Sequence, residues 1–396
     1  MGEPGRTIQG IELFDATMID AGCRGYSGAI FDGRYIYYAP LNNGNFHGRV
    51  LRYDTTLAFE SRAAWVEFDS AQIDPDSRGF VNALFDGRYL YLVPYFNGRH
   101  HGHVTRYDTQ SPFEQATSWQ TFDVQSVDAL CRGFVSGCFD GRYLYLASYQ
   151  LDMTTTHGHV VRYDTQARFD DAASWQTFDT TSVQTDCRGF HSALSEGDYV
   201  YFVPYLRGGG EYSGMLARYD KRLPFDDAAA WATFDMTALH PGCRGYVGAT
   251  CRDGVLYFAP YIDGQDRHGR VARYDARKAL DDLSAWSWFD VSQVDVGSRG
   301  FFGAICHENY LYLVPHCRGV GQYHGQLTRY DLRLPFDDPA SWSICDLARV
   351  HSDCRGFIGG VLQGDYLYLA PFETDAGCHV GMMTRIDLSS QTPWSA

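Results

Sequence analysis

An Arg-Gly pair followed by Phe or Tyr recurs seven times along the 396-residue chain, and its arginine is the first candidate for chemistry. Guanidinium groups hold carboxylates and phosphates through paired N–H bonds, so several of them on one face could bind an anion. The seven arginines stand 54 to 56 residues apart, at Arg24, Arg78, Arg132, Arg188, Arg244, Arg299 and Arg355. We treat all seven as candidate ligand-binding residues.

Histidine is the second candidate, because a His-Gly pair recurs between the arginines. It occurs at His47, His101, His157, His268 and His324. These imidazoles could line a pocket, act as bases or bind a metal. They could equally bond a neighbouring loop carbonyl, and we favour that structural role while keeping the five as candidates. The spacing offers only two His-x-His pairs, His101 with His103 and His157 with His159, so we assign no metal ligand.

The arginines also have a structural interpretation. Seven guanidiniums near one axis repel one another unless each is paired or an anion lies among them. Each repeat supplies a carboxylate in a Phe-Asp or equivalent sequence, at Asp15, Asp69, Asp123, Asp179, Asp235, Asp290 and Asp346. We favour a buried Arg–carboxylate pair over a ligand role for the repeated arginines.

A single asymmetric ligand needs unlike groups around it, so positions that differ between repeats are further candidates. His240 and His351 stand four residues before a repeat arginine, where other units carry Asp or Gln. Tyr205 belongs to a Pro-Tyr sequence that becomes Pro-His at His316. We add these four residues to the candidate site. The loops of units four and seven are also unusual, with Glu211 and Tyr212 in one and Glu373, Asp375, Cys378 and His379 in the other.

Four strands per unit are expected to position these residues, as the third unit illustrates. Its first run, Gly133 to Phe139, is rich in small residues. Asp140-Gly141 follows and is a strong hairpin signal because both turn positions favour positive φ. The second run, Arg142 to Tyr149, alternates aromatic and aliphatic residues, which is typical of a strand.

The second half of the unit completes the pattern. A variable loop leads to a third run that ends in Arg162-Tyr163-Asp164. Phe169 to Trp175 is predicted to contain one helical turn capped by Asp170. The fourth run is Gln176 to Val183.

Seven units of about fifty residues, each with four antiparallel strands, predict an all-β fold, a seven-bladed β-propeller. We expect one domain over residues 1–396, with blades starting near residues 24, 78, 132, 188, 244, 299 and 355. The small-residue run suits the crowded innermost position of a blade. We interpret the repeated tryptophan, at Trp65, Trp119, Trp175, Trp231, Trp286, Trp342 and Trp394, as packing between blades.

The two ends of the chain are predicted to share one blade. The last unit stops near Trp394, before its fourth strand. Ile11 to Asp15 matches the fourth-strand sequence, so residues 10–20 would complete the last blade. Such pairing closes the ring and removes two exposed sheet edges.

The unit resembles a kelch repeat. Arg132-Gly133, Tyr143 to Leu146, Tyr163-Asp164 and Trp175 fall in the order of the kelch pattern, and the similarity covers all seven units. The kelch diglycine is absent, and Pro-Tyr stands in its place, for example at Pro204-Tyr205. The resemblance implies the propeller fold and no single activity, because propellers serve as scaffolds, lectins and enzymes.

Composition excludes some partners. The chain carries 33 basic and 48 acidic residues, a net charge of −15, and no basic run, so we expect neither nucleic acid nor an anionic membrane as a partner. The start, MGEPGRTIQG, has no basic segment before an apolar one, so we expect no secretory signal. Five of the 11 cysteines precede Arg-Gly, where Ser77 and Ser298 stand in other units. This predicts small reduced thiols and a cytoplasmic protein.

Three functions remain open from the sequence. The first is a binding protein that holds a polar, anionic small molecule, or an acidic segment of a partner protein, on the Arg/His/Tyr face around the axis. The second is an enzyme that uses the same face for hydrolysis, elimination or group transfer. The third is a multivalent lectin. No Gly-x-Ser-x-Gly, Walker, HExxH or dinucleotide sequence is present, and no cofactor is predicted.

Overall fold

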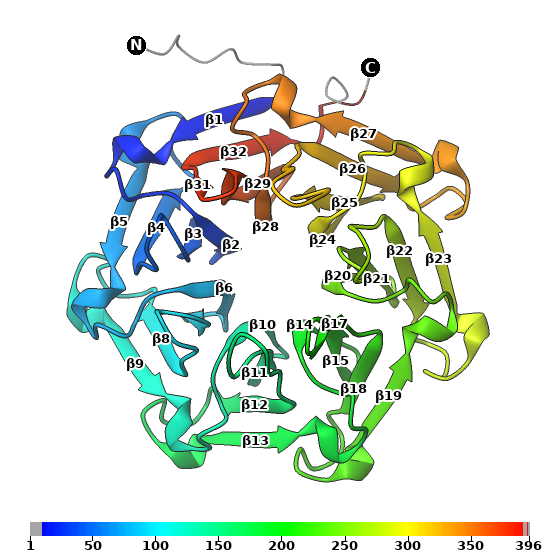
Figure 1. Cartoon of the computed structure of the whole chain (residues 1–396). Coiled ribbons are helices and arrows are strands. Elements are labelled where there is room, and N and C mark those ends of the chain that lie inside the picture. Colours follow the sequence, from blue (N-terminus) through cyan, green and yellow to red (C-terminus); the bar gives the residue numbers. More distant parts are fainter. Residues whose placement is uncertain (1–9, 391–393, 395–396) are drawn as a thin grey trace.

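Seven four-stranded antiparallel sheets form a closed ring, as predicted (Figure 1). The computed structural model describes residues 10–390 and residue 394. We number the blades from one, which begins with β2, to seven, which begins with β28. Within this part of the chain, the helices are single 3-10 turns, and none has the length and apolar character needed to cross a lipid bilayer.

The strands repeat in the same order in each blade. The innermost strands are β2 (Tyr26–Phe31), β6 (Phe80–Phe85), β10 (Phe134–Phe139), β14 (Phe190–Glu196), β20 (Tyr246–Arg252), β24 (Phe301–His307) and β28 (Phe357–Gln363). The second strands are β3 (Tyr35–Pro40), β7 (Tyr89–Pro94), β11 (Tyr143–Ser148), β15 (Tyr199–Pro204), β21 (Val255–Pro260), β25 (Tyr310–Pro315) and β29 (Tyr366–Pro371).

The outer half of each blade is equally regular. The third strands are β4 (Arg49–Asp54), β8 (His103–Asp108), β12 (His159–Asp164), β18 (Met215–Asp220), β22 (Arg270–Asp275), β26 (Gln326–Asp331) and β32 (Met382–Asp387). The fourth strands are β5 (Trp65–Asp69), β9 (Trp119–Asp123), β13 (Trp175–Asp179), β19 (Trp231–Asp235), β23 (Trp286–Asp290), β27 (Trp342–Asp346) and, in blade seven, β1 (Ile11–Asp15).

Short elements join the strands. Helices before a fourth strand are η2 (Arg62–Ala64), η4 (Ala116–Ser118), η6 (Ala172–Ser174), η8 (Ala228–Ala230), η10 (Leu283–Ala285) and η12 (Pro339–Ser341). Helices after a fourth strand are η1 (Ala16–Met18), η3 (Ser70–Gln72), η5 (Val124–Ser126), η7 (Thr180–Ser182), η9 (Met236–Ala238), η11 (Val291–Gln293) and η13 (Leu347–Arg349). Blades four and seven carry extra hairpins, β16 (Leu206–Gly208) with β17 (Glu211–Tyr212) and β30 (Glu373–Asp375) with β31 (Cys378–His379).

Aspartate side chains accept backbone N–H groups in these turns. The structure differs from the prediction in the φ angle of Asp140 and in the residue that caps η6. Asp140 accepts backbone N–H groups of Arg142 and Tyr143 at 3.0 and 2.7 Å, and only Gly141 of the Asp-Gly pair has positive φ. Helix η6 is capped by Asp171, which accepts the N–H of Ala173 at 3.0 Å. The predicted cap, Asp170, instead bonds Arg168.

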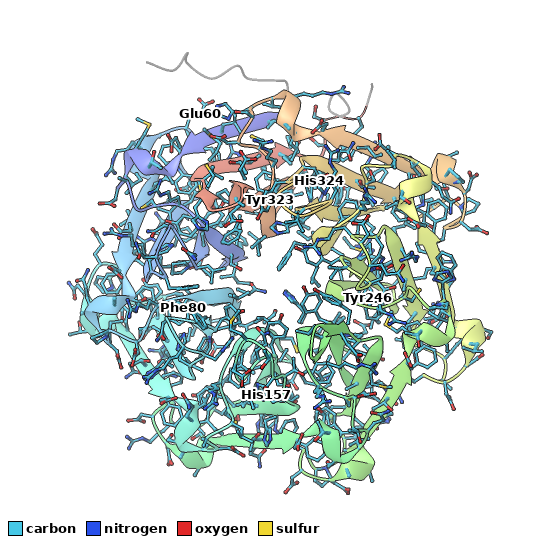
Figure 2. The ribbon with its side chains drawn as sticks, viewed as in Figure 1. Glu60, Phe80, His157, Tyr246, Tyr323 and His324 are labelled. Carbon is cyan, nitrogen blue, oxygen red and sulfur yellow. The ribbon has the colours of Figure 1, made fainter. Side chains whose placement is uncertain are left out.

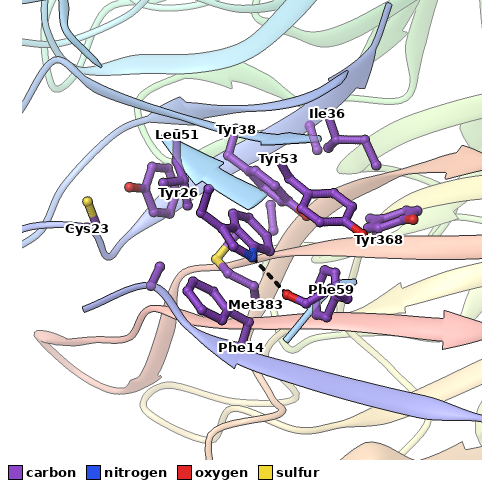
Figure 3. Close-up of a cluster of buried hydrophobic side chains, with 14 of the residues drawn as sticks. Phe14, Cys23, Tyr26, Ile36, Tyr38, Leu51, Tyr53, Phe59, Tyr368 and Met383 are labelled. Atoms are coloured by element: carbon purple, nitrogen blue, oxygen red, sulfur yellow. Dashed lines mark hydrogen bonds between the residues drawn. The ribbon is translucent and has the colours of Figure 1, made fainter. Parts of the chain in front are cut away.

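The layer that repeats between neighbouring blades is aromatic, and Figure 3 shows it where blades seven and one meet. Trp65 is 1% exposed, and its indole N–H donates to the carbonyl of Phe59 at 2.8 Å. Its ring stacks on Phe14 of the preceding blade, with centroids 4.7 Å apart. The five later tryptophans at 119, 175, 231, 286 and 342 repeat both contacts, which confirms their predicted packing role.

The closing blade corrects one assignment. β1 pairs with β32, which confirms the predicted closure, and Ile11 lies opposite Ile386 as Trp65 lies opposite Tyr53 in blade one. Ile11 therefore takes the tryptophan position of blade seven. Trp394 lies 4.0 Å from the guanidinium of Arg329, the place that phenylalanine holds in other blades, so its assignment to the repeat tryptophan was wrong.

The arginine of the Arg-Tyr-Asp sequence also joins neighbouring blades. The guanidinium of Arg106 lies 4.1 Å from the ring centroid of Tyr89 in its own blade. It lies 4.2 Å from the ring of Phe169 in the next blade. A cation held between two rings resists separation of the blades.

Candidate functional site

The two sets of connections that carry the candidate residues meet at one end of the ring, which we call the top face. They are the loops between second and third strands and the connections from each fourth strand to the next innermost strand. Gly133, in the connection into blade three, donates its N–H to the carbonyl of His101 in the blade-two loop at 3.0 Å. Viewed along the axis, side chains of all seven blades extend toward the centre (Figure 2).

The repeated arginines all lie on the top face, but the predicted carboxylate partners lie elsewhere. The Phe-Asp carboxylates cap the following 3-10 helices, as Asp179 does by accepting the N–H of Thr181 at 3.0 Å. Arg299 bonds Asp266 at 2.9 Å, and Arg355 lies 3.6 Å from Asp375, neither of which is a Phe-Asp residue. The predicted buried Arg–carboxylate pairing was therefore wrong.

The other five arginines have no carboxylate partner within the described residues. Arg132 and Arg244 donate to the backbone carbonyls of Ala129 and Pro241, at 3.4 and 2.8 Å. For the side chains of Arg24, Arg78 and Arg188 the described part of the chain shows no hydrogen bond or ion pair. These groups lie at the junctions between blades, and Arg188 and Arg244 each line a groove beside the β16–β17 hairpin.

Two of the five His-Gly histidines bond a loop carbonyl, as the favoured interpretation expects, whereas the Nε2 atoms of His47, His101 and His324 have no partner within the described residues. His157 and His268 place Nε2 2.9 Å from the carbonyl oxygens of Arg132 and Arg244. Burial lowers the pKa of His47, His268 and His324 to about 4 and that of His101 and His157 to about 3, so they are neutral. The structure does not gather them into one pocket.

His240 and His351 are also backbone caps. Their Nδ1 atoms accept N–H groups two residues later, from Gly242 at 3.0 Å and from Asp353 at 3.2 Å. Asp20 accepts the N–H of Gly22 in the same way at 2.8 Å. The variation at this repeat position therefore preserves one function, which is to close a turn.

Tyr205 and His316 belong to a ring of side chains around the axis that we call the inner ring. Its members follow the second strands and are Leu41, Tyr95, Tyr149, Tyr205, Tyr261, His316 and Phe372. From Tyr95 to Phe372, neighbouring ring centroids are 5.7–6.5 Å apart. Burial, then the nearby His324 and Arg267, lowers the pKa of His316 to about 3, so this ring carries no charge.

A second set, which we call the outer ring, was noticed in the sequence only at Tyr212 and His379 and was not recognised as a set. Its members directly precede the His-Gly position and are Phe46, His100, Thr156, Tyr212, Arg267, Tyr323 and His379. Tyr212 lies against Tyr205 at 5.3 Å and Tyr323 against His316 at 5.3 Å, between ring centroids. Five residue types at one repeat position were a readable sign of specialisation, since the next position is histidine in five of the seven blades.

Arg267 is the single arginine of the outer ring, which contains no lysine, so its side chain carries a positive charge at neutral pH. Its guanidinium lies 4.3 Å from the ring centroid of Tyr261. Its Nε is buried and has no hydrogen-bond partner, and no carboxylate within the described residues pairs with it. Its charge acts on Tyr205 and His316, which places it beside the inner ring.

An acid–base cluster lies in the neighbouring sector. The Tyr323 hydroxyl donates to Glu373. His379 Nδ1 lies 3.4 Å from the other carboxylate oxygen, and the side chains of His379 and Glu373 are 6% and 13% exposed. Burial and the bond to Glu373 raise the pKa of Tyr323, and burial lowers the pKa of His379.

Below the inner ring, the innermost strands enclose a cavity of about 150 Å³, which we call the axial cavity. His191 and Phe302 reach across the axis between blades four and six, with ring centroids 4.9 Å apart. The polar wall consists of His191 with Ser27, Asn82, Ser136 and Ser192. None of the repeated arginines or His-Gly histidines lines this cavity.

Within the described chain, one group of His, Cys, Asp or Glu is close enough to share a metal ion. It consists of His307, Glu308 and Asp365, in the hairpin turns of blades six and seven. Glu308 and Asp365 are exposed, and none of the three was a candidate from the sequence.

Comparison with known proteins identifies the architecture. No protein-family model and no curated protein matches the chain. PorZ of Porphyromonas gingivalis, described as an essential bacterial surface component of the type-IX secretion system, superimposes with a TM-score of 0.59 at 11% identity. The match covers 92% of this chain but only 46% of PorZ. The computationally designed protein Ika8 matches over 95% of this chain and all of its own, at 8% identity and a TM-score of 0.48. At 11% identity the likeness to PorZ shows the fold alone.

Proposed function

We propose that the protein binds one anionic small molecule on the propeller axis at the top face, with Arg267 holding the anionic group. The observation that carries this proposal is the guanidinium of Arg267, which has no carboxylate partner in the described chain and lies over Tyr261 at 4.3 Å. A partly buried charge without a counter-ion is costly, and an anion from solution would relieve that cost. The inner-ring aromatics offer flat apolar surface beside it, which suits a ligand with a ring.

The wider face supports the same ligand chemistry. Arg24, Arg78 and Arg188 add cationic groups without carboxylate partners in the described chain, although the whole protein carries a net charge of −15. Positive groups gathered on one face of an acidic protein attract anions to that face. An acidic segment of a partner protein would present the same carboxylate, so the test includes both sources.

The test titrates benzoate by calorimetry at low salt. We expect binding that weakens with salt and weakens at least tenfold in Arg267→Met. Arg318→Met, an exposed arginine of the blade-six loop, is the matched control and should bind as the natural protein does. Benzamide, with the same ring and no charge, should bind poorly. Equal binding of benzamide and benzoate would contradict the proposal, and tighter binding of a triglutamate peptide would assign the site to an acidic segment.

One observation favours catalysis as a second candidate function. The carboxylate of Glu373 lies between the hydroxyl of Tyr323 and the imidazole of His379. Such a carboxylate can accept a proton from a ligand while the phenol supplies one. The probe is phenylpyruvate in D₂O, where Glu373 would remove a proton from the carbon beside the keto group. Glu373→Gln should abolish catalysed deuterium uptake, and Glu211→Gln, on the same face, should not. Uptake at the buffer rate in the natural protein excludes this activity.

Two further proposals concern the cellular compartment of the protein and the origin of its repeat. The described cysteines form no disulfide, and the five before Arg-Gly are fully buried, which supports a reducing compartment such as the cytoplasm. The order of Arg-Gly, Tyr-Asp and Trp within each blade supports kinship with kelch repeats.

A further inference from the structure

We propose that the axial cavity is a second binding site, for one neutral ring-sized molecule that carries a hydroxyl group. It differs from the anion site in place and in chemistry, and it does not depend on Arg267. Its volume of about 150 Å³ matches cavities that accept benzene in other proteins. The proposal assigns phenol-like molecules as the ligand class.

The apolar part of the wall suits a ring. Val81, Val135, Val247, Ile358 and Phe302 each contribute a side chain from a different blade. Burial of an aromatic ring against such groups is favourable by about 25 cal/mol per Å² of apolar surface. The wall holds no Arg, Lys, Asp or Glu, so a charged ligand would leave its charge unpaired.

The polar part of the wall contains a hydroxyl group without a hydrogen-bond partner. Ser27 is 0% exposed, lines the axial cavity, and its Oγ has no hydrogen-bond partner within the described residues. A buried hydroxyl without a partner is destabilising, because it has lost its hydrogen bonds to water. Asn82 and Ser136 on neighbouring blades already bond each other at 3.0 Å, so they do not satisfy Ser27. A ligand hydroxyl would do so.

The cavity is built by close approach of the innermost strands. A Cβ at Gly248 would lie 3.2 Å from the Cα of Gly303, and one at Gly359 would lie 3.4 Å from the Cα of Gly28. These glycines have positive φ at a bulge in each strand. A larger side chain is disfavoured at these positions, because the φ angles are positive and the backbone of the neighbouring strand lies close.

Two side chains of the cavity wall also contact the inner ring. His191 and Phe302 have ring centroids 4.9 Å apart, and they pack against Tyr205 and His316 respectively. Burial lowers the pKa of His191 to about 3, so it presents a neutral ring to the axial cavity. A ligand below this pair is therefore selected for hydrogen bonding and shape, and a ligand above it for charge.

The test measures binding of phenol and toluene to the full chain by ligand-observed NMR. We expect both to bind, phenol more tightly, and Ser27→Ala to weaken phenol at least fivefold while leaving toluene unchanged. Ser148→Ala is the matched control, because its buried Oγ also lacks a partner but does not line the axial cavity. Phenol affinity in this variant should equal that of the natural protein.

Filling the cavity provides a second test. Val247→Phe should abolish binding of both molecules, and Ile358→Phe serves the same purpose should the first variant fail to fold. Arg267→Met should leave phenol binding unchanged while it removes benzoate, which separates failure here from failure of the anion site. No binding of phenol, or binding that survives both cavity-filling changes, overturns the proposal.

Discussion

His268 Nε2 lies 2.9 Å from the carbonyl oxygen of Arg244, and His268 Nδ1 accepts the N–H of Arg270 at 3.2 Å. A neutral imidazole thus bonds both the connection into its own blade and the start of its own third strand. The histidine that the sequence offered as a ligand is a structural bridge, and its neighbour Arg267 faces the axis.

Substitution of His268 tests this bridge. Blade four carries Ser213 at the same position, where Ser213 Oγ accepts the N–H of Met215 at 3.0 Å. His268→Ser should therefore lower the free energy of unfolding by about 1–2 kcal/mol, whereas His268→Leu, which leaves two buried backbone groups unbonded, should lower it by about 3 kcal/mol. Urea denaturation measures both. Equal losses would mean that the hydrogen bonds contribute nothing beyond packing.

The same histidines predict acid sensitivity. Burial holds the pKa values of His47, His101, His157, His268 and His324 at about 3 to 4, below the ordinary value of 6.5. Between pH 6.5 and 4 the unfolded chain binds protons that the folded chain does not. Stability is therefore complete above pH 6.5 and falls as the pH is lowered, by about 1.4 kcal/mol per pH unit for each histidine once the unfolded form is protonated.

Urea denaturation at pH 7.5 and pH 5 measures this dependence. His268→Ser should reduce proton uptake on unfolding at pH 5 by close to one. A variant that keeps the full pH dependence would show that His268 is already protonated in the folded protein. His351→Asp is the control, because His351 is only partly buried and its capping role passes to aspartate in other blades.

Strand order was predictable because one hydrophobic pattern is repeated seven times, and each copy checks the others. What failed was the choice of partner for polar side chains. Asp171 rather than Asp170 caps η6, and the Phe-Asp carboxylates cap helices instead of binding arginines. Several acceptors lie within a few residues of each hydrogen-bond donor. The three-dimensional course of the backbone decides which acceptor is used, and spacing in the sequence does not.

The site was only partly predictable for a related reason. Tyr205 was found as part of the repeated Pro-Tyr sequence and His316 because it breaks that sequence, and both lie in the inner ring. Arg267 also stands at a position that varies between repeats. It was missed because the repeated histidine directly after it, His268, was chosen as the candidate instead. The axial cavity depends on the approach of neighbouring blades, and no segment of sequence records that distance.

Arg106 is held between aromatic rings of two blades, a contact we call the arginine clamp. It predicts that two arginines of blade two differ in their contribution to the free energy of unfolding. Arg106 lies between the rings of Tyr89 and Phe169, whereas Arg88, 52% exposed, forms a surface ion pair with Asp108 at 2.8 Å. Arg106→Ala should cost about 2 kcal/mol of unfolding free energy, through lost cation–π contact and packing. Arg88→Ala should cost less than about 1 kcal/mol. Similar costs for the two would show that the clamp adds nothing to an ordinary surface pair.

Closure of the ring by the first strand leads to the final prediction. Phe14 of β1 stacks on Trp65 with centroids 4.7 Å apart and planes at 4°, and Phe68 stacks on Trp119 at 4.8 Å and 11°. Both phenylalanines are about 4% exposed. If β1 is bound as firmly as a strand inside the ring, Phe14→Ala and Phe68→Ala should each cost about 3–5 kcal/mol in the same cooperative unfolding transition.

Hydrogen exchange locates any difference between these two variants. With a firmly closed ring, amide protection in β32, the strand that pairs with β1, should fall no further in Phe14→Ala than protection across the whole protein falls. Selective loss of protection in β32, together with a much smaller cost for Phe14→Ala than for Phe68→Ala, would show that β1 detaches before the ring unfolds. In that case the closing strand would be a weak point of the propeller, and binding at Arg267, in blade five, should survive its detachment.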